Sequence, residues 1–129
     1  MNKLNLLLLD DEIDLLEILE YELEDGGVAD IANIYTAKNG IEGLKVLKEN
    51  SIDCIVSDIN MPEMNGIEFV KAAQANGFTK PIMFLSAHGD PETIKKTEDL
   101  TVYHFIQKPF DADHLCTSIK DALTASANL

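Results

Sequence analysis

Five polar side chains stand directly after short apolar runs of this sequence: Asp10, Asp11, Asp58, Ser86 and Lys108. They comprise three carboxylates, one hydroxyl and one ammonium. Carboxylates that gather in one place repel one another unless one is protonated or a cation joins them. A hard divalent ion such as Mg²⁺ takes oxygen ligands of this kind. Because a metal and a lysine together can neutralise a phosphoryl group under attack, the set predicts an aspartate that accepts phosphate.

Asp58 is the predicted acceptor. The run before it, Cys54 to Ser57, is apolar and uninterrupted, which is typical of a strand buried on both faces of a parallel sheet. A carboxylate at the end of a buried strand is expected to have a partner or a function, because an unpaired buried charge is costly. Pro62 soon follows, so the chain turns there. For a lone aspartate, capping of a turn or helix is the better interpretation, and its companions reverse that preference.

The apolar runs alternate with amphipathic segments. Strands are predicted at residues 4–9, 30–35, 52–57, 81–85 and 102–106. Helices are predicted after Asp11, Asn39, Asn65, Asp90 and Asp111. Short crossovers imply a parallel sheet with helices on both faces. We therefore predict an α/β fold with a five-stranded parallel sheet. If this is the flavodoxin-like (βα)5 three-layer sandwich, with the strand order 2-1-3-4-5, the first and third strands are neighbours at the switch point.

Several details accompany this prediction. The second strand is less apolar than the others and is predicted at a sheet edge. The inward faces of the first two helices are predicted to include Ile13, Ile18 and Ile41. Residues 124–129 are expected to fray. Asp11 is expected to cap the first helix.

The length and charge of the chain restrict its possible domain count and partners. The chain has 129 residues, so one domain is expected over residues 1–129 with its core at about 4–123. The formal net charge of −13 argues against direct nucleic-acid binding and against an anionic membrane surface. Cys54 and Cys116 are interpreted as buried free thiols of a reducing compartment. The apolar residues 4–9 are too few for a signal core or a membrane span, so a cytoplasmic protein is expected.

Each polar residue alone has an ordinary interpretation. The pair Asp10-Asp11 is more often a helix cap than a metal site, Ser86 a turn hydroxyl, and Lys108 a surface lysine. All of them at successive strand ends make a strong signal. The motifs that carry it are Asp10-Asp11, Asp58, Met61-Pro62 with Gly66, Ser86-Ala87 and Lys108-Pro109-Phe110. As a set, over almost the whole chain, they resemble the receiver domain of bacterial two-component response regulators, the single-domain chemotaxis type included.

The resemblance implies roles for these residues. Asp58 would be the phosphoacceptor. Asp11 and Asp58 would ligate Mg²⁺ directly, together with the backbone carbonyl of Asn60, while Asp10 would act largely through bound water. Ser86 and Lys108 would contact the phosphoryl group. The phosphoryl donor would be a phosphohistidine on a sensor histidine kinase or a histidine phosphotransfer protein, and the aspartyl phosphate would later be hydrolysed.

The resemblance also implies a switch. Ser86 would move toward the phosphoryl group and Phe105 would turn inward, which alters how a downstream protein target or output domain binds the face formed by the fourth helix, fifth strand and fifth helix. A plain core role for Phe105 is about equally good. Asn60 and His88 would tune dephosphorylation, whereas His104 and His114 are interpreted as structural or exposed. The stretch at residues 101–104 departs from the small residues that the family often has there.

Other functions remain open at this point. A phosphorylation-independent adaptor could use the same fold. A dehalogenase-like phosphatase would need a second acidic residue two positions after its aspartate, and Asn60 stands there. A flavin or nucleotide binder is disfavoured, because the loop after the first strand is acidic and lacks glycine. No output domain is recognisable, so the chain is either a stand-alone receiver or part of a longer protein.

Overall fold

The sheet has the predicted topology. The computed structural model describes residues 3–86, 95–98 and 100–127. Five parallel strands follow the order β2-β1-β3-β4-β5. The strands are β1 (Leu4–Leu9), β2 (Ala32–Ala37), β3 (Cys54–Asp58), β4 (Ile82–Ser86) and β5 (His104–Gln107). The described helices are α1 (Ile13–Asp25), α2 (Gly40–Glu49), α3 (Gly66–Ala75) and α5 (Ala112–Ala127), with a 3₁₀ turn at Val28–Asp30. The helix predicted after Asp90 falls mostly outside the described residues.

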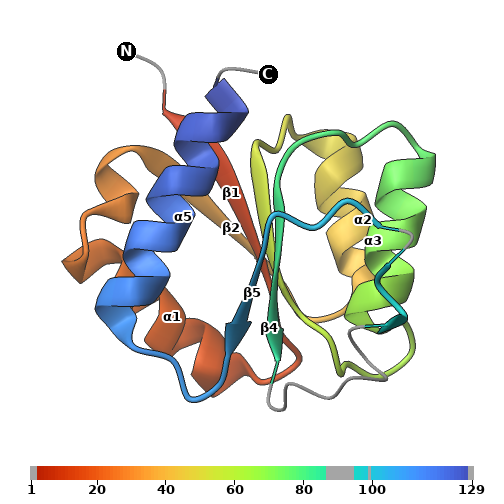
Figure 1. The fold of residues 1–129 in the computed structure, drawn as a ribbon, viewed down its shortest axis with the longest axis horizontal. Coiled ribbons are helices and arrows are strands. Elements are labelled where there is room, and N and C mark those ends of the chain that lie inside the picture. Colours follow the sequence, from red (N-terminus) through yellow and green to blue (C-terminus); the bar gives the residue numbers. More distant parts are fainter. Residues whose placement is uncertain (1–2, 87–94, 99, 128–129) are drawn as a thin grey trace.

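The molecule has three layers (Figure 1). Helices α1 and α5 cover one face of the sheet, and α2 and α3 cover the other. Successive strand residues point to opposite faces, so Leu8 and Val56 join the core under α1 and α5, whereas Leu7 and Ile55 join the core under α2 and α3. The inner strands are therefore buried on both sides, which explains their uninterrupted apolar sequences. β2 lies at an edge of the sheet, as predicted.

Two of the helices begin at their predicted asparagines. The Asn65 side chain accepts a hydrogen bond from the Glu68 backbone N–H at 2.8 Å, and the Glu68 carboxylate accepts one from the Asn65 N–H at 3.3 Å. This capping box satisfies two amides that the helix leaves unpaired. Asn39 likewise accepts from the Glu42 N–H at 2.8 Å. Helices α2 and α3 are thus fixed at the ends nearest the carboxyl edge of the sheet.

The predicted cap of α1 was wrong. The N-cap is Glu12, which makes no side-chain cap bond. The Asp10 carboxylate accepts the Glu12 N–H instead, at 2.9 Å. Asp11 is exposed and takes no part in capping.

Three isoleucines predicted to face inward are more than half exposed: Ile13, Ile18 and Ile41. In α1 the buried stripe is carried by Leu16, Leu19 and Leu23, at the spacing of about one helical turn.

Some boundaries also differ from the prediction. β2 starts two residues later than predicted because the 3₁₀ turn occupies residues 28–30. β5 likewise starts two residues late, at His104, and α5 continues to Ala127 where fraying was expected from residue 124.

Candidate functional site

The three predicted carboxylates come together at the carboxyl edge of the sheet. β1 and β3 are neighbours, and Leu9 pairs with Ser57, so Asp10 and Asp58 leave the sheet side by side. One ligand oxygen from each of Asp10, Asp11 and Asp58 lies within 4.8 Å of the others. Asp10 is fully buried and Asp58 is 7% exposed, whereas Asp11 faces solvent. The site thus contains two buried like charges and a third at its mouth.

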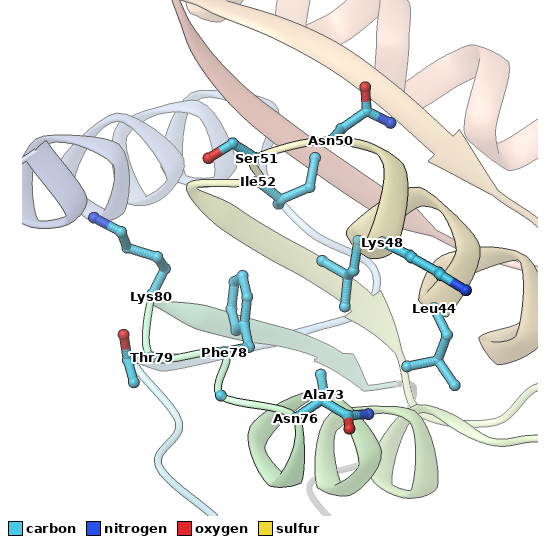
Figure 2. A pocket seen from close by; sticks show the side chains of 12 residues that line it. Leu44, Lys48, Asn50, Ser51, Ile52, Ala73, Asn76, Phe78, Thr79 and Lys80 are labelled. Carbon is cyan, nitrogen blue, oxygen red and sulfur yellow. The ribbon is translucent and has the colours of Figure 1, made fainter.

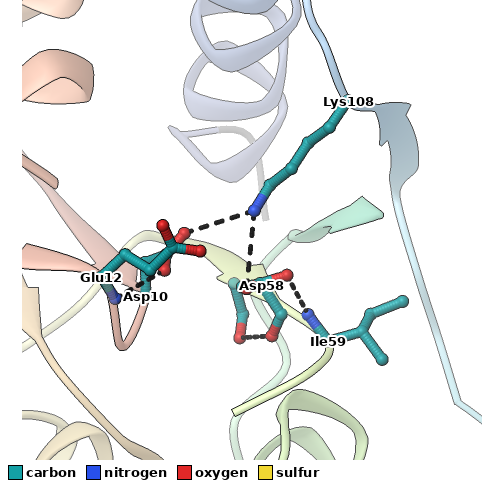
Figure 3. Close-up of polar contacts among 6 residues, drawn as sticks. Asp10, Glu12, Asp58, Ile59 and Lys108 are labelled. Carbon is teal, nitrogen blue, oxygen red and sulfur yellow. Dashed lines mark hydrogen bonds and ion pairs between the residues drawn. The ribbon is translucent and has the colours of Figure 1, made fainter. Parts of the chain in front are cut away.

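A single ammonium group reaches both buried carboxylates. Lys108 follows β5, which is separated from β1 by two strands, and its extended side chain crosses the edge of the sheet (Figure 3). Its Nζ atom lies 3.4 Å from Asp10 Oδ2 and 3.5 Å from Asp58 Oδ2. Sequence reasoning placed Lys108 in the site but did not foresee its pairing with Asp10. No sequence pattern reports how far a flexible lysine extends.

The surroundings of Asp58 disfavour its charged form. Burial raises the pKa of Asp58 above its usual value, and the nearby Asp10 carboxylate raises it further. The Lys108 ammonium lowers this pKa, as does the Ile59 backbone N–H, which donates to Asp58 Oδ1 at 2.9 Å. The balance remains on the raised side. An additional cation at the site would therefore be favourable.

The loop after Asp58 is closed by a glycine. The Gly66 N–H donates to the Ile59 carbonyl at 2.8 Å, and a Cβ atom at Gly66 would collide with the Asp58 carbonyl oxygen. The Ser57 hydroxyl donates to that same oxygen at 2.8 Å. Only glycine permits so close an approach of two backbones. This role was not recognised from the sequence, although a glycine in the first turn of a helix, where alanine is the better helix former, was a signal.

The other predicted site residues that the structure describes lie in or just after β3, β4 and β5. Ser86 is the last residue of β4, and its carbonyl accepts the Lys108 N–H at 2.7 Å, which ties the ends of β4 and β5 together. Phe105 is half-buried, with its ring 5.8 Å from that of Phe84 and tilted by 33°. Asn60 is exposed just beyond β3. His88 lies outside the described residues.

Comparison with known proteins agrees with this geometry. The model of the response regulator receiver domain matches residues 6–120. The chain belongs to the response regulator receiver family. It is 37% identical, over 95% of its length, to the transcriptional regulatory protein GlrR of Escherichia coli (strain K12), of which it covers 27%. It is 30% identical to a probable chemotaxis protein CheY of Rhizobium etli, with 92% of this chain and 91% of that protein covered.

Solved receiver structures share the fold. Chemotaxis protein CheY4 of Vibrio cholerae superposes with a TM-score of 0.83 at 30% identity, covering 94% of this chain and 99% of that one. A signal receiver domain from Pseudomonas fluorescens Pf-5 gives a TM-score of 0.87 at 21% identity, covering 99% of this chain and 100% of that one. At this identity the match supports only the shared fold. The chain spans about a quarter of the length of GlrR. None of the helices in the described part of this receiver is long and apolar enough to cross a membrane.

The donor set of this receiver fits a hard divalent cation. All three potential ligands are carboxylates, which Mg²⁺ prefers over nitrogen or sulfur. The ammonium of Lys108 offsets only part of their charge. Two of the carboxylates are buried, where uncompensated charge is most costly. Asp10, Asp11 and Asp58 are therefore suited to hold such an ion.

The receiver also has a hollow that is separate from the acidic site. It has a volume of about 670 Å³ and opens between the C-terminal ends of α2 and α3, at the amino edge of the sheet (Figure 2). Leu44 and Phe78 project into it, whereas the ammonium groups of Lys48 and Lys80 point away at its opposite ends. Lys80 donates to the Ser126 carbonyl at 3.0 Å. The described residues that line it include no carboxylate or histidine, so it is distinct from the acidic site.

Proposed function

We propose that this receiver is a phosphorylation-dependent signalling switch in which Asp58 accepts a phosphoryl group from a phosphohistidine. In the reaction a carboxylate oxygen of Asp58 forms a bond to phosphorus while the bond from phosphorus to the donor's imidazole nitrogen breaks. The electron pair of that bond returns to the imidazole. The observation that carries the proposal is the position of Asp58, a buried carboxylate at the switch point of the sheet, beside a lysine and two further carboxylates.

Lys108 and Ser86 are the proposed contacts of the phosphoryl group. Lys108 Nζ is 3.5 Å from the Asp58 oxygen, so a small movement would carry its charge to a phosphoryl oxygen. Ser86 ends the neighbouring strand β4, and its backbone is bonded to that of Lys108. Its hydroxyl would donate to a second phosphoryl oxygen. Both groups would compensate charge that develops on the transferred group.

Asp10, Asp11, Asp58 and the backbone carbonyl of Asn60 are the proposed ligands of Mg²⁺. When bound, the ion would neutralise charge on the carboxylates and on the incoming phosphoryl oxygens. The carboxylates supply oxygen ligands within 4.8 Å of one another. Gly66 supports this arrangement by holding the Ile59 carbonyl, next to Asn60, against the start of α3.

The proposed readout passes from Ser86 to Phe105. The two residues lie on paired strands, and Phe105 stacks beside Phe84 in the register of those strands. A half-buried ring beside a buried one can occupy two packings, and phosphorylation would shift the population between them. We further propose that Asn60 and His88 tune hydrolysis of the aspartyl phosphate. An His88→Ala variant with an unchanged aspartyl-phosphate lifetime would remove the role of His88.

The proposed partners are a sensor histidine kinase or histidine phosphotransfer protein upstream, and a protein target or attached output domain downstream. The relatives include GlrR, which is much longer than this chain, and the Rhizobium etli protein, which is nearly equal to it in length. The family is therefore compatible with an attached output domain and with a separate target protein. We treat residues 1–129 as one receiver domain with its core at about 4–123.

Intact mass spectrometry tests the acceptor. The receiver is incubated with acetyl phosphate and Mg²⁺, beside Asp58→Asn and the control Asp14→Asn, which removes an exposed carboxylate of α1. A single phosphoryl adduct is expected in the parent and in the control, absent from Asp58→Asn and dependent on Mg²⁺. If no adduct forms while a reference receiver is modified in the same tube, the proposal fails and a phosphorylation-independent adaptor replaces it.

A further inference from the structure

Two histidines that take no part in the acidic site lie together beside the edge strand β5. His104 begins β5 and His114 lies in the first turn of α5. Their ring centroids are 5.9 Å apart, with the ring planes at 67°. His104 is half-buried and His114 is exposed, so solvent and other molecules can reach the pair.

The spacing of the two rings suits a shared metal ion. Imidazole is the commonest protein ligand of zinc-like ions. With Zn–N bonds of about 2.0–2.1 Å, two imidazoles on one zinc place their centroids about 5–6 Å apart, depending on the angle at the metal. The observed 5.9 Å lies at the wide end of this range, so the rings would have to move slightly closer to reach the tetrahedral angle. To share an ion, each ring would have to aim one nitrogen at a common point by rotation of its side chain.

One chain supplies only half of such a site. Zinc in a structural site is held by four ligands in a tetrahedron. Beside the pair is a shallow hollow of about 250 Å³ lined by Tyr103, His104, Ser118 and Asp121. Within the described ranges, however, the acidic triad is the one group of three or more side chains close enough to share an ion, so Asp121 does not complete a site with both histidines.

We propose that His104 and His114 bind Zn²⁺ together with the same two histidines of a second copy of this chain. A two-fold axis through the ion would bring four imidazoles to it, because each copy presents the same pair. The proposal does not rest on phosphorylation at Asp58. It assigns a metal site and a self-association surface to the side of the molecule formed by β5 and α5.

Charge and exposure on this face fit a metal-dependent contact. Each chain carries a formal charge of −13, which opposes self-association, and a divalent cation at the contact would offset part of it. Asp121 adds an exposed negative charge beside the pair. Tyr103 is 46% exposed in the same hollow, and exposed aromatic residues are enriched where proteins associate. Association is therefore expected with the ion and not without it.

Zinc titration followed by native mass spectrometry and light scattering tests the proposal. Excess Mg²⁺ is present throughout, so that the carboxylates of the acidic triad compete poorly for zinc. A dimer that contains one zinc ion is expected, and a chelator should return it to monomer. His104→Gln and His114→Gln should each weaken zinc binding by about tenfold or more and remain monomeric at the same zinc concentration. Asp58→Asn should dimerise like the parent, which separates this site from the phosphoacceptor site.

Several results would overturn the proposal. Zinc binding that is equal in the parent and in both histidine variants would place the ion elsewhere. One zinc per chain without a change in mass would exclude the shared site, as would an absence of binding at micromolar zinc. Urea unfolding of the metal-free variants shows whether each is folded, and X-ray absorption should find four nitrogen ligands at about 2.0–2.1 Å in the parent dimer.

Discussion

The Nζ atom of Lys108 lies 3.5 Å from Oδ2 of Asp58, and the same atom lies 3.4 Å from Oδ2 of Asp10. One ammonium therefore serves two buried carboxylates that belong to different strands. Because β5 carries the lysine while β1 and β3 carry the acids, the charge balance of the site depends on three strand ends at once. Removal of any member changes the environment of the other two.

Lys108→Gln should destabilise the metal-free protein. The substitution leaves two buried carboxylates without their cation, and we expect the free energy of unfolding to fall by about 1–3 kcal/mol, less than for a fully buried pair because Lys108 is 19% exposed. Urea unfolding measures this loss. Excess Mg²⁺ should reduce it, since the ion supplies positive charge to the same carboxylates.

Lys45→Gln is the matched control for Lys108→Gln, because Lys45 is an exposed lysine of α2. It should change stability by no more than about 0.5 kcal/mol. An equal loss for Lys108→Gln with and without Mg²⁺ would contradict a shared role of the lysine and the metal in neutralising the acids.

Stability should depend on pH through Asp58. Its pKa in the folded protein is raised, chiefly by burial, above the ordinary value of 3.8. The folded protein therefore binds this proton more readily than the unfolded chain, and protonation stabilises it. The destabilising contribution of Asp58 is fully present at neutral pH, shrinks as the pH falls through the raised pKa, and vanishes below 3.8.

Comparison of Asp58→Asn with the parent isolates this effect. In the absence of metal the variant should be the more stable protein at neutral pH, and its advantage should decline as the pH is lowered. Excess Mg²⁺ should remove the advantage, because the ion favours the ionised carboxylate of the parent. A stability difference that is constant across the pH range would show that burial of the Asp58 charge has no net cost.

Gly66→Ala should be strongly destabilising. The new methyl group would meet the Asp58 carbonyl oxygen and the Ile59 backbone, neither of which can move without displacing β3 or the start of α3. We expect a loss of about 2–4 kcal/mol, as for other steric insertions into a packed interior.

Gly77→Ala provides the contrast, because nothing lies within 4 Å of its Cβ position and only its φ of 96° opposes a side chain. It should cost about 1 kcal/mol. Chemical denaturation of the two variants separates the cost of a steric collision, at Gly66, from the cost of an unfavourable φ angle, at Gly77. A Gly66→Ala protein as stable as the parent would show that the loop after Asp58 can shift freely.

Sequence periodicity predicted the strands, and the flavodoxin-like strand order then predicted which residues gather at the edge of the sheet. Parallel strands bring their carboxyl ends together, so a polar residue after each apolar run is placed by topology alone. The reach of Lys108 to Asp10 and the fit of Gly66 against Asp58 depend on side-chain extension and backbone contact, which no local pattern encodes. Ile13 and Ile18 were misplaced because apolar residues beside a buried stripe remain exposed when no neighbouring element covers them.

Asp11 should matter only when metal is present. Its carboxylate is exposed and lies at the mouth of the site, so Asp11→Asn should change the free energy of unfolding of the metal-free protein by no more than about 0.5 kcal/mol. Mg²⁺ should stabilise the parent by about 2.7 kcal/mol at a concentration one hundred times its Kd, because it binds the folded state alone. Asp11→Asn should lose most of this gain, whereas Asp14→Asn, which removes an exposed acid of α1, should keep it. Thermal unfolding at increasing Mg²⁺ distinguishes the two. If Asp11→Asn keeps the full stabilisation, Asp11 is not a ligand and the ion is held by the two buried carboxylates without it.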